Sequence, residues 1–484
     1  MKIHCFLGPI PIDFFSMQKE ILIETFTKKG DGAGRVVLEE GQLPSRVEIP
    51  HTMPQDRVIA DLRKKRKRVV KGRLVEILTP SPFRVQAHCE HATMCGGCSW
   101  QCMEYREQLK EKERIIGTTF RDFFPQSELF PIIACDPCFH YRNKMEFSFS
   151  ENRGGMRYLG LMIARAKRYV FNIHKCFLAS FWFSDLLNAT RKWWEESALS
   201  AYCPLENRGC LRTLTLREGK NTGEKMVILT LSHPEEILAL EEKIESFVQM
   251  VVNTVGEGVS IFLRLHKAQA GEETVFEEKM LYGQDHIKEK LCLGHRELLF
   301  TISPSSFFQP NTLQAQKLFL RALEMVRPKP TDTLLDLYCG SGAVGMLFAP
   351  FVHKVIGIEE NAHAVEDGRK NLLLNGIENF SIHEGDAGEL LTRFRKDPQF
   401  TLPDIVVVDP PRGGLDALAI EQILLIKPKI LLYISCNPAT QIENIKSLQL
   451  HYRVAKIQPI DQFPHTPHIE NIVLLERLSS KIDF

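Results

Sequence analysis

The segment TLLDLYCGSGAVGMLFAP, residues 333–350, contains a short apolar run, a glycine-rich turn and a second apolar run. This order is typical of the first strand, turn and helix of a nucleotide-binding α/β domain. Gly340, Gly342 and Gly345 satisfy the pattern G-x-G-x-x-G, and Glu359 ends the next predicted strand. From about residue 300 onward, predicted strands and helices alternate. We therefore predict an α/β fold with a doubly wound, Rossmann-like sheet in this half.

The glycine turn alone fits both NAD and S-adenosylmethionine, because both ligands need a close backbone approach and a carboxylate for ribose hydroxyls. Asp336 adds a carboxylate near the turn, where it can meet a cationic aminoacyl group rather than a pyrophosphate. Asp386 ends a third predicted strand and can meet an adenine edge. DPPR at 409–412 has no role in a dehydrogenase. We favour S-adenosylmethionine, and an NAD-dependent iron–sulfur oxidoreductase is the weaker alternative.

Two further strand ends carry reactive groups. The strand KILLYI ends at Cys436, within YISCNPATQ (433–441), and DIVVVD ends at Asp409. Open α/β sheets form their ligand crevices at such carboxyl ends. Glu470 leads into the last apolar strand, and a carboxylate that faces a thiol is what alkylation of pyrimidine carbon 5 requires. The simpler interpretations are that Cys436 is a structural cysteine and that Glu470 belongs to a polar turn before the last strand.

The region 20–78 reads as four or five short strands separated by turns, including the glycine-rich GDGAG at 30–34. Short strands at this spacing predict a small β-barrel of the OB-like kind. The run RKKRKR at 63–68 would give such a barrel affinity for RNA phosphates without reading sequence. The alternative is that RKKRKR is a solvated run of charges without an RNA contact.

Cys89, Cys95 and Cys98 are spaced like ligands of a zinc ion or an iron–sulfur cluster, with Gly96 and Gly97 allowing the backbone to wrap closely. The spacing does not choose between zinc and iron. The candidates for a fourth ligand are Cys102, the Cys135/Cys138 pair, Cys176, His88 and His91.

The composition is that of an ordinary globular protein, with 484 residues, a net charge of +1 and thirteen cysteines. No apolar run approaches the roughly 20 residues of a membrane helix. The first sixteen residues resemble a signal peptide, but Pro9, Pro11 and Asp13 interrupt the apolar stretch. We expect a monomeric cytoplasmic protein with reduced cysteines and no membrane partner.

Four motifs in order, DLYCGSGAVG, VVDPPRGG, YISCNPAT and FPHTPHIE, resemble those of the RNA 5-methyluridine (uracil-C5) methyltransferases, in the branch with a TRAM domain and an iron–sulfur cluster. The resemblance covers about residues 20–475. It implies an extension at 1–16, an RNA-binding TRAM barrel at 17–78, a central α+β domain with the cluster at 79–300, and an S-adenosylmethionine-dependent methyltransferase domain at 301–484.

The resemblance also implies site residues. The implied ligands of a [4Fe–4S] cluster are Cys89, Cys95, Cys98 and Cys176. The implied contacts of S-adenosylmethionine are Gln309, Tyr338, Glu359 and Asp409, to which the strand argument adds Asp386. Cys436 is the expected nucleophile and Glu470 the expected base. Ala343 stands where some relatives carry a polar donor-contacting residue, so that contact is not expected here.

Relatives that possess both the barrel and the cluster generally act on large-subunit ribosomal RNA, which implies 23S rRNA as the substrate. The alternatives are a tRNA uracil-5 methyltransferase and an RNA cytosine-5 methyltransferase. The latter enzymes typically carry a Pro-Cys pair where this chain has Asp409-Pro410-Pro411. An RNA-binding or assembly protein with an inactive transferase half is the alternative outside the enzymes.

Overall fold

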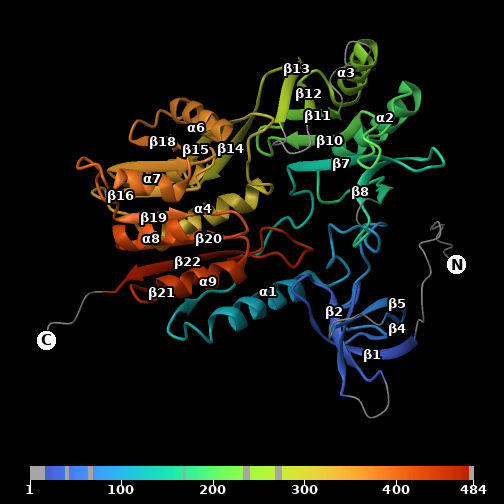
Figure 1. Cartoon of the computed structure of the whole chain (residues 1–484), viewed down its shortest axis with the longest axis horizontal. Helices are drawn as coiled ribbons and strands as arrows, with labels where there is room; N and C mark the ends of the chain where they lie inside the picture. The colour runs from blue at the N-terminus through green and yellow to red at the C-terminus, as the bar shows by residue number, and fades with distance from the viewer. Residues whose placement is uncertain are drawn as a thin grey trace. The chain divides into compact units, whose positions relative to one another are not determined.

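The computed structural model describes residues 17–38, 43–63, 69–166, 169–232, 240–267 and 275–478 (Figure 1). The predicted extension at 1–16 and residues 64–68 of the basic run lie outside the described residues. Contacts divide the chain into two compact units, one of residues 1–108 with 465–467 and one of 109–464 with 468–484. The domain boundaries expected after residues 78 and 300 stay predictions.

The first unit contains a closed five-stranded barrel with the order β1-β2-β3-β5-β4. Its strands are β1 (Met17–Phe26), β2 (Gly32–Val36), β3 (Ser45–Ile49), β4 (Arg57–Arg63) and β5 (Val69–Thr79). Alternate apolar side chains such as Ile21, Val47 and Val58 fill the interior. The GDGAG turn needs glycine, because a Cβ on Gly34 would lie 2.3 Å from the carbonyl oxygen of Leu22. The predicted small barrel is therefore confirmed.

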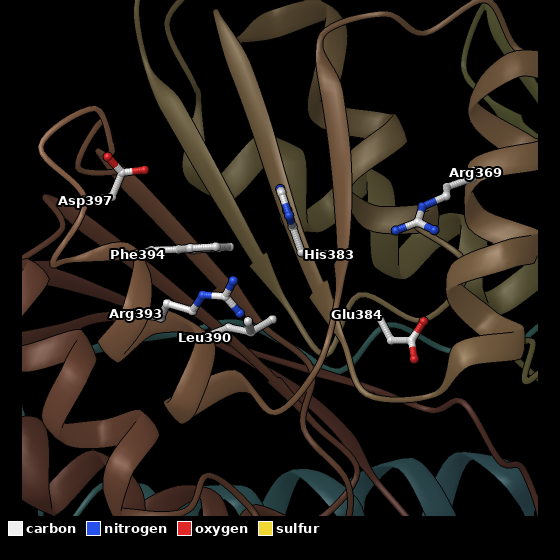
Figure 2. A pocket seen from close by; sticks show the side chains of 7 residues that line it. All are labelled: Arg369, His383, Glu384, Leu390, Arg393, Phe394 and Asp397. Carbon is white, nitrogen blue, oxygen red and sulfur yellow. The ribbon is translucent and has the colours of Figure 1, made fainter.

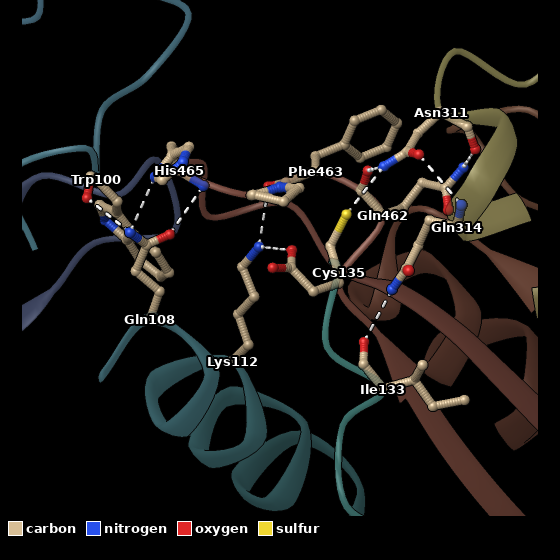
Figure 3. Close-up of polar contacts among 12 residues, drawn as sticks. Trp100, Gln108, Lys112, Ile133, Cys135, Asn311, Gln314, Gln462, Phe463 and His465 are labelled. Carbon is tan, nitrogen blue, oxygen red and sulfur yellow. Dashed lines mark hydrogen bonds and ion pairs between the residues drawn. The ribbon is translucent and has the colours of Figure 1, made fainter. Parts of the chain in front are cut away.

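Beyond the barrel, the first unit is tied together by Trp100 and Gln108 (Figure 3). The indole nitrogen of Trp100 donates to the carbonyl oxygen of Gly30 at 3.0 Å. The side-chain amide of Gln108 donates to the carbonyl oxygen of Trp100 at 3.1 Å, and its oxygen accepts the backbone N–H of His465 at 2.8 Å. These buried polar contacts attach residues 465–467 to this unit.

The second unit is built on an eight-stranded sheet of order β18-β17-β16-β19-β20-β22-β21-β6 (Figure 1). Its strands are β6 (Glu128–Leu129), β16 (Thr333–Leu337), β17 (Lys354–Glu359), β18 (Phe380–Glu384), β19 (Ile405–Val408), β20 (Ile430–Ser435), β21 (Tyr452–Ile460) and β22 (Glu470–Arg477). The five strands from β18 to β20 are parallel, and β22 runs antiparallel to β20. This confirms the doubly wound α/β sheet expected from the alternation of strands and helices.

Helices cover both faces of this sheet. The helices are α1 (Tyr105–Phe120), α4 (Thr312–Val326), α5 (Ala343–Phe348), α6 (Ala362–Leu374), α7 (Ala387–Phe394), α8 (Ala417–Ile426) and α9 (Pro438–Leu448), with the short 3-10 helix η2 (Ala349–Phe351). Apolar side chains of α4, α5 and α6 pack on one face, and those of α7, α8, α9 and the second half of α1 pack on the other. The near-continuous apolar runs of the strands reflect burial on both faces.

A second sheet of this unit has seven strands in the order β13-β12-β11-β10-β7-β8-β9. Its strands are β7 (Lys144–Glu151), β8 (Arg157–Met162), β9 (Val170–Asn172), β10 (Leu211–Glu218), β11 (Lys225–Ser232), β12 (Val259–Lys267) and β13 (Val275–Tyr282). Its helices are α2 (Phe181–Ser197) and α3 (Glu241–Val255), and a hairpin of β14 (Ile287–Leu293) and β15 (Arg296–Ile302) follows the sheet. None of the described helices combines the length and apolar composition that a membrane-spanning helix needs.

Candidate active site

A cavity of about 650 Å³ opens at the carboxyl ends of β16, β17, β19 and β20. Its volume lies in the range of ligand pockets in proteins, about 300 to 1,000 Å³. Among its lining residues are six that the sequence analysis selects: Gln309, Tyr338, Glu359, Asp409, Cys436 and Glu470. One cavity thus unites residues that are far apart in the sequence.

Cys436 and Glu470 approach each other because of strand register. β20 and β22 are antiparallel neighbours, and Ser435 lies opposite Asn471. β20 ends at this pair; Cys436 directly follows β20 and Glu470 begins β22, so the two residues lie at the same end of neighbouring strands. Asn437 then caps α9, with its side-chain oxygen accepting the N–H of Ala439 at 3.3 Å. Cys436 and Glu470 both line the cavity.

The electrostatics of the cavity disfavour negative charge on the sulfur until other groups compensate. Burial raises the pKa of the Cys436 thiol, and the nearby Glu470 and Asp409 raise it further. Arg412 opposes this shift through its positive charge and a hydrogen bond to the sulfur. Arg412 therefore stabilises the thiolate form, which is the nucleophilic one.

Asp409 and Glu470 form a pair of neighbouring buried carboxyl groups. Burial raises the pKa of Asp409 to about 7. Burial also raises the pKa of Glu470 well above its usual value, with the charge of Asp409 adding to the rise and Arg412 opposing it. Two carboxylates that share a site do not both ionise readily. Such a pair can take up a proton at neutral pH, as a general base must.

The glycine turn after β16 presents backbone and carboxylate groups to the cavity. Glu359 accepts the N–H of Gly340 at 2.9 Å and that of Asn361 at 2.8 Å, which fixes its carboxylate at the end of β17. Tyr338 has a φ of 61°, an uncommon value for a residue with a side chain. The hydroxyl of Tyr338 donates to Asp416 at 3.3 Å. These contacts hold the first turn in a single shape.

Asp336 also lines the cavity, near the glycine turn as the sequence predicts. Its Oδ2 accepts the N–H of Gly345 at 2.8 Å, so one oxygen serves the start of α5. Burial raises the pKa of Asp336 to about 8. Its contact with a cationic aminoacyl group stays a prediction.

Asp386 is not among the described residues that line the cavity. It follows β18 and caps α7, where its Oδ1 accepts the N–H of Glu389 at 2.9 Å. Its charge contributes to the raised pKa of Tyr338, whose first cause is burial. Asp386 therefore lies near the cavity, and its contact with adenine stays a prediction.

The sequence analysis did not single out the aromatic side chains of the cavity, Phe307, Phe308 and Phe463. Phe307 is 65% exposed, so its ring stands at the surface of the cavity. The doubled phenylalanine directly before Gln309 was a usable signal, since exposed aromatic rings commonly stack on nucleobases. The loop itself is anchored by Asn143, whose side-chain amide donates to the carbonyl oxygen of Gln309 at 2.9 Å.

Buried polar contacts hold the segment that leads to Glu470 (Figure 3). Lys112 and Asp461 form a fully buried ion pair, and Lys112 also donates to the carbonyl oxygen of Phe463 at 3.1 Å. Asn311 donates from its side chain to the carbonyl oxygen of Gln462 at 3.1 Å. Breaking a buried ion pair costs about 3–5 kcal/mol, so these contacts fix Phe463 firmly at the cavity.

The structure does not confirm the predicted cluster cysteines as a metal site. Among the described residues, no group of three or more His, Cys, Asp or Glu side chains is arranged to hold a metal ion. Cys89, Cys95 and Cys98 belong to the first unit and Cys176 to the second. The cluster therefore rests on the sequence alone.

A second cavity, of about 490 Å³, lies at the β18 edge of the sheet between α6 and α7 (Figure 2). Arg369 and Arg393 bring positive charges to it, and Glu384 and Asp397 bring negative ones. His383 and Phe394 meet edge to face there, with ring centroids 5.1 Å apart. The cavity contains none of the predicted site residues and no thiol, so the reaction is assigned to the first cavity.

Comparisons with known proteins agree with this geometry. Residues 273–478 match the family described as tRNA (Uracil-5-)-methyltransferase. The chain is 43% identical over 440 residues to an uncharacterized RNA methyltransferase of Protochlamydia amoebophila, an alignment that covers 89% of this chain and 99% of that protein. It is 40% identical over 394 residues to an uncharacterized RNA methyltransferase of Chlamydia trachomatis, covering 81% of this chain and 98% of that protein.

Among solved structures, the chain is similar to the Pyrococcus abyssi tRNA (uracil-54, C5)-methyltransferase in complex with S-adenosyl-L-homocysteine. The TM-score is 0.70 at 24% identity, and the match covers 95% of this chain and 100% of that one. This likeness shows a shared fold. The relatives of 40% identity or more over most of its length lead to one conclusion: the chain belongs to a family of RNA methyltransferases, and its residues 273–478 match the tRNA (Uracil-5-)-methyltransferase model.

Proposed function

We propose that this enzyme methylates carbon 5 of a uridine in 23S rRNA through a covalent bond between Cys436 and the uracil ring. The observation that carries the proposal is that Cys436, just after β20, and Glu470, at the start of the neighbouring β22, line one cavity and lie near enough for Glu470 to raise the pKa of the thiol. A structural cysteine would not need a raised-pKa carboxyl partner on the neighbouring strand.

The cavity suits a cationic methyl donor. Glu359 and Asp409 provide carboxyl groups along its wall, and the glycine turn leaves room for a ligand against the backbone. The aromatic rings of Phe307 and Phe308 supply apolar surface. Gln309, Tyr338, Glu359 and Asp409 would hold the donor, with Asp386 at the adenine. S-adenosylmethionine supplies the electrophilic methyl group that carbon 5 of the uracil accepts.

Uracil carbon 5 is a weak nucleophile, and residues of the chain activate it in the proposed mechanism. The Cys436 thiolate adds to carbon 6, and the displaced electron pair of the ring double bond spreads over carbon 5 and oxygen 4. Arg412, which stabilises the thiolate, is also placed to offset negative charge on the ring. The addition turns carbon 5 into an enolate carbon that can be alkylated.

Glu470 completes the reaction. It takes the proton from carbon 5, the electron pair re-forms the ring double bond, and the sulfur of Cys436 leaves as a thiolate. General bases of this kind contribute about 100- to 10,000-fold to rate. The raised pKa of Glu470 makes the group a stronger base than an ordinary carboxylate. The target uridine must leave its stack to reach the cavity, which favours a single-stranded or loop site.

The remaining parts of the proposal concern the rest of the chain. The five-stranded barrel is proposed to act as a TRAM domain that binds RNA phosphates. Cys89, Cys95, Cys98 and Cys176 are proposed as ligands of a [4Fe–4S] cluster, on the strength of their spacing and the family resemblance. No step of the mechanism depends on that cluster. We further propose that the enzyme acts as a monomer in the cytoplasm.

The test is direct methylation. The purified protein is incubated with methyl-labelled S-adenosylmethionine and either unmodified 23S rRNA transcript or unmodified tRNA, and the digested RNA is examined by mass spectrometry. Labelled 5-methyluridine in 23S rRNA supports the proposal. Label in tRNA alone would show that the substrate is tRNA rather than 23S rRNA. Label in 5-methylcytidine would show that the target base is cytosine, and no label in any RNA would refute the activity.

A further inference from the structure

The segment Arg142-Asn143-Lys144 lies beside the wall of the cavity. The backbone N–H of Asn143 donates to the carbonyl oxygen of Pro310 at 2.9 Å, and its side chain holds the carbonyl oxygen of Gln309. Nε of Arg142 donates to the carbonyl oxygen of Lys144 at 3.0 Å. The segment is thus fixed against the loop that lines the cavity, with a cationic side chain on either side of Asn143.

Lys144 lies among groups of its own charge. Arg217 occupies the directly opposite position on β10. The guanidinium of Arg217 donates to the carbonyl oxygen of Ser306 at 2.8 Å, and that of Arg264 donates to the carbonyl oxygen of Pro304 at 3.0 Å. Both arginines therefore converge on the loop that continues to Gln309. Like charges directly opposite each other in a sheet are destabilising.

The acidic groups nearby offset part of this positive charge, since Asp367 and Glu289 act on Arg217. Glu278 pairs with Arg264 at 2.6 Å, and Glu146 accepts a hydrogen bond from Thr215 at 3.3 Å. In the part of the chain that the structure describes, neither the ammonium of Lys144 nor the terminal amino groups of Arg142 have a hydrogen-bond or ion-pair partner. A partly buried positive charge without a partner is costly, and an anion bound there would relieve that cost.

The titration of Lys144 agrees with this geometry. Burial lowers the pKa of Lys144 to about 8, and Arg217, Arg264 and Arg142 lower it further while Glu146 opposes them. The ammonium is still mostly protonated at neutral pH. An anion beside it would restore the pKa toward its ordinary value, which is a free-energy gain for binding.

We propose that Lys144 and Arg142 bind a phosphodiester group of the RNA substrate and thereby position the target uridine at the cavity. The proposal rests on the proposed function, since it takes RNA as the substrate. The planar guanidinium of Arg142 matches two phosphate oxygens, and Lys144 adds a point charge. The second cavity offers no comparable site, because Glu384 and Asp397 accompany Arg369 and Arg393 there.

The test compares Lys144→Met with Lys279→Met in the full-length protein. Lys279 is exposed on β13, so its loss changes the net charge equally away from the cluster. The probe is a fluorescent RNA hairpin of about 20 nucleotides with a uridine-containing loop. For Lys144→Met we expect about tenfold weaker binding, in line with a lost charged hydrogen bond, and a salt slope smaller by about 0.7–0.9. The control should match the wild type.

A second measurement uses pH and Lys144→Arg. The charged groups that face Lys144 are Arg142, Glu146 on its own strand, Arg217 on β10, and Arg264 with its partner Glu278 from β12 and β13. Affinity of the wild type for RNA is expected to fall between about pH 7 and about pH 9, as Lys144 loses its proton. The arginine variant stays charged and should bind RNA with little change over this range.

Three results would overturn the proposal. One is unchanged RNA affinity and salt slope in Lys144→Met. Another is weaker binding of S-adenosylhomocysteine with unchanged RNA binding, which would assign the cation to the donor's carboxylate. A third is a Lys144→Met variant that binds RNA as the wild type does but whose RNA binding no longer responds to inorganic phosphate. That result would show that Lys144 binds a free anion rather than the RNA. If the wild type binds RNA through Lys144 but forms no 5-methyluridine, the phosphate site stands and the proposed function fails.

Discussion

The carboxyl group of Glu470, which shares the cavity with Cys436, has a pKa that its surroundings set. Burial raises this pKa most, the charge of Asp409 raises it further, and the charge of Arg412 lowers it. At this position a carboxyl group can accept the carbon-5 proton and hold it. A serine or alanine at position 436 would leave that base with no adduct on which to act.

Replacing Glu470 by Gln should separate the two halves of the reaction. The thiolate can still add to carbon 6 and carbon 5 can still be methylated, but the proton at carbon 5 stays. We expect a covalent protein–RNA complex that survives a denaturing gel, and a turnover rate lower by about 100- to 10,000-fold. Cys436→Ala should give no complex, while binding of S-adenosylhomocysteine is retained. Normal turnover by Glu470→Gln would assign the base to another residue.

The pH dependence follows from the direction of the pKa shifts. Cys436 and Glu470 must both lose a proton to act, and burial raises the pKa of each. The single-turnover rate should therefore rise with pH, at pH values well above the usual titration of a carboxyl group. Asp409→Asn removes a like charge from both groups, so the rise should move to lower pH although the maximal rate falls. A profile that does not move in this variant would contradict the arrangement.

At the scale of elements, the packing of α5 against β18 depends on Gly345. A Cβ at this position would lie 2.4 Å from the ring of Phe380. Gly345→Ala should therefore lower the free energy of unfolding by about 1–3 kcal/mol, as overpacking in a core does. Gly117 in α1 is the matched control, since a Cβ there meets nothing within 4 Å. Gly117→Ala should be neutral or stabilising by up to about 1 kcal/mol in thermal or urea unfolding. Equal effects of the two variants would refute this account of the turn.

The sequence could predict those site residues that stand at the ends of strands. Asp409 and Cys436 each follow an apolar strand, and parallel strands share one edge, so their meeting follows from the fold class. The approach of Glu470 could not be predicted in this way, because it depends on β22 inserting antiparallel beside β20. The place of Phe463 in the cavity and the bond of Asn143 to the Gln309 loop were not predicted for the same reason, since both result from packing between distant segments.

At the scale of the whole molecule, the sequence predicted the barrel from its turns and the doubly wound sheet from its alternation. It did not predict the hydrogen bond of Asp336 to Gly345, by which one oxygen of this cavity residue supports α5. The cysteine spacing predicts ligands, but no metal group is found among the described residues. Spacing alone does not fix where side chains from distant segments gather.

The cluster proposal can be tested by colour. Protein purified without oxygen should be brown from its iron–sulfur cluster. Cys89→Ser should lose the colour, and Cys203→Ser, a partly buried cysteine outside the predicted ligand set, should keep it. Colourless wild-type protein that contains one zinc ion per chain would show that the site holds zinc and not an iron–sulfur cluster.

The measurement that tests the central claim most directly uses RNA in which 5-fluorouridine replaces uridine. Fluorine at carbon 5 is not removed as a proton, so the bond between Cys436 and carbon 6 cannot be released after methyl transfer. Mass spectrometry of the intact product should find protein, RNA and one methyl group joined, and peptide mapping should place the bond on Cys436. Methylated RNA without any covalent complex, or a bond on another residue, would contradict the account.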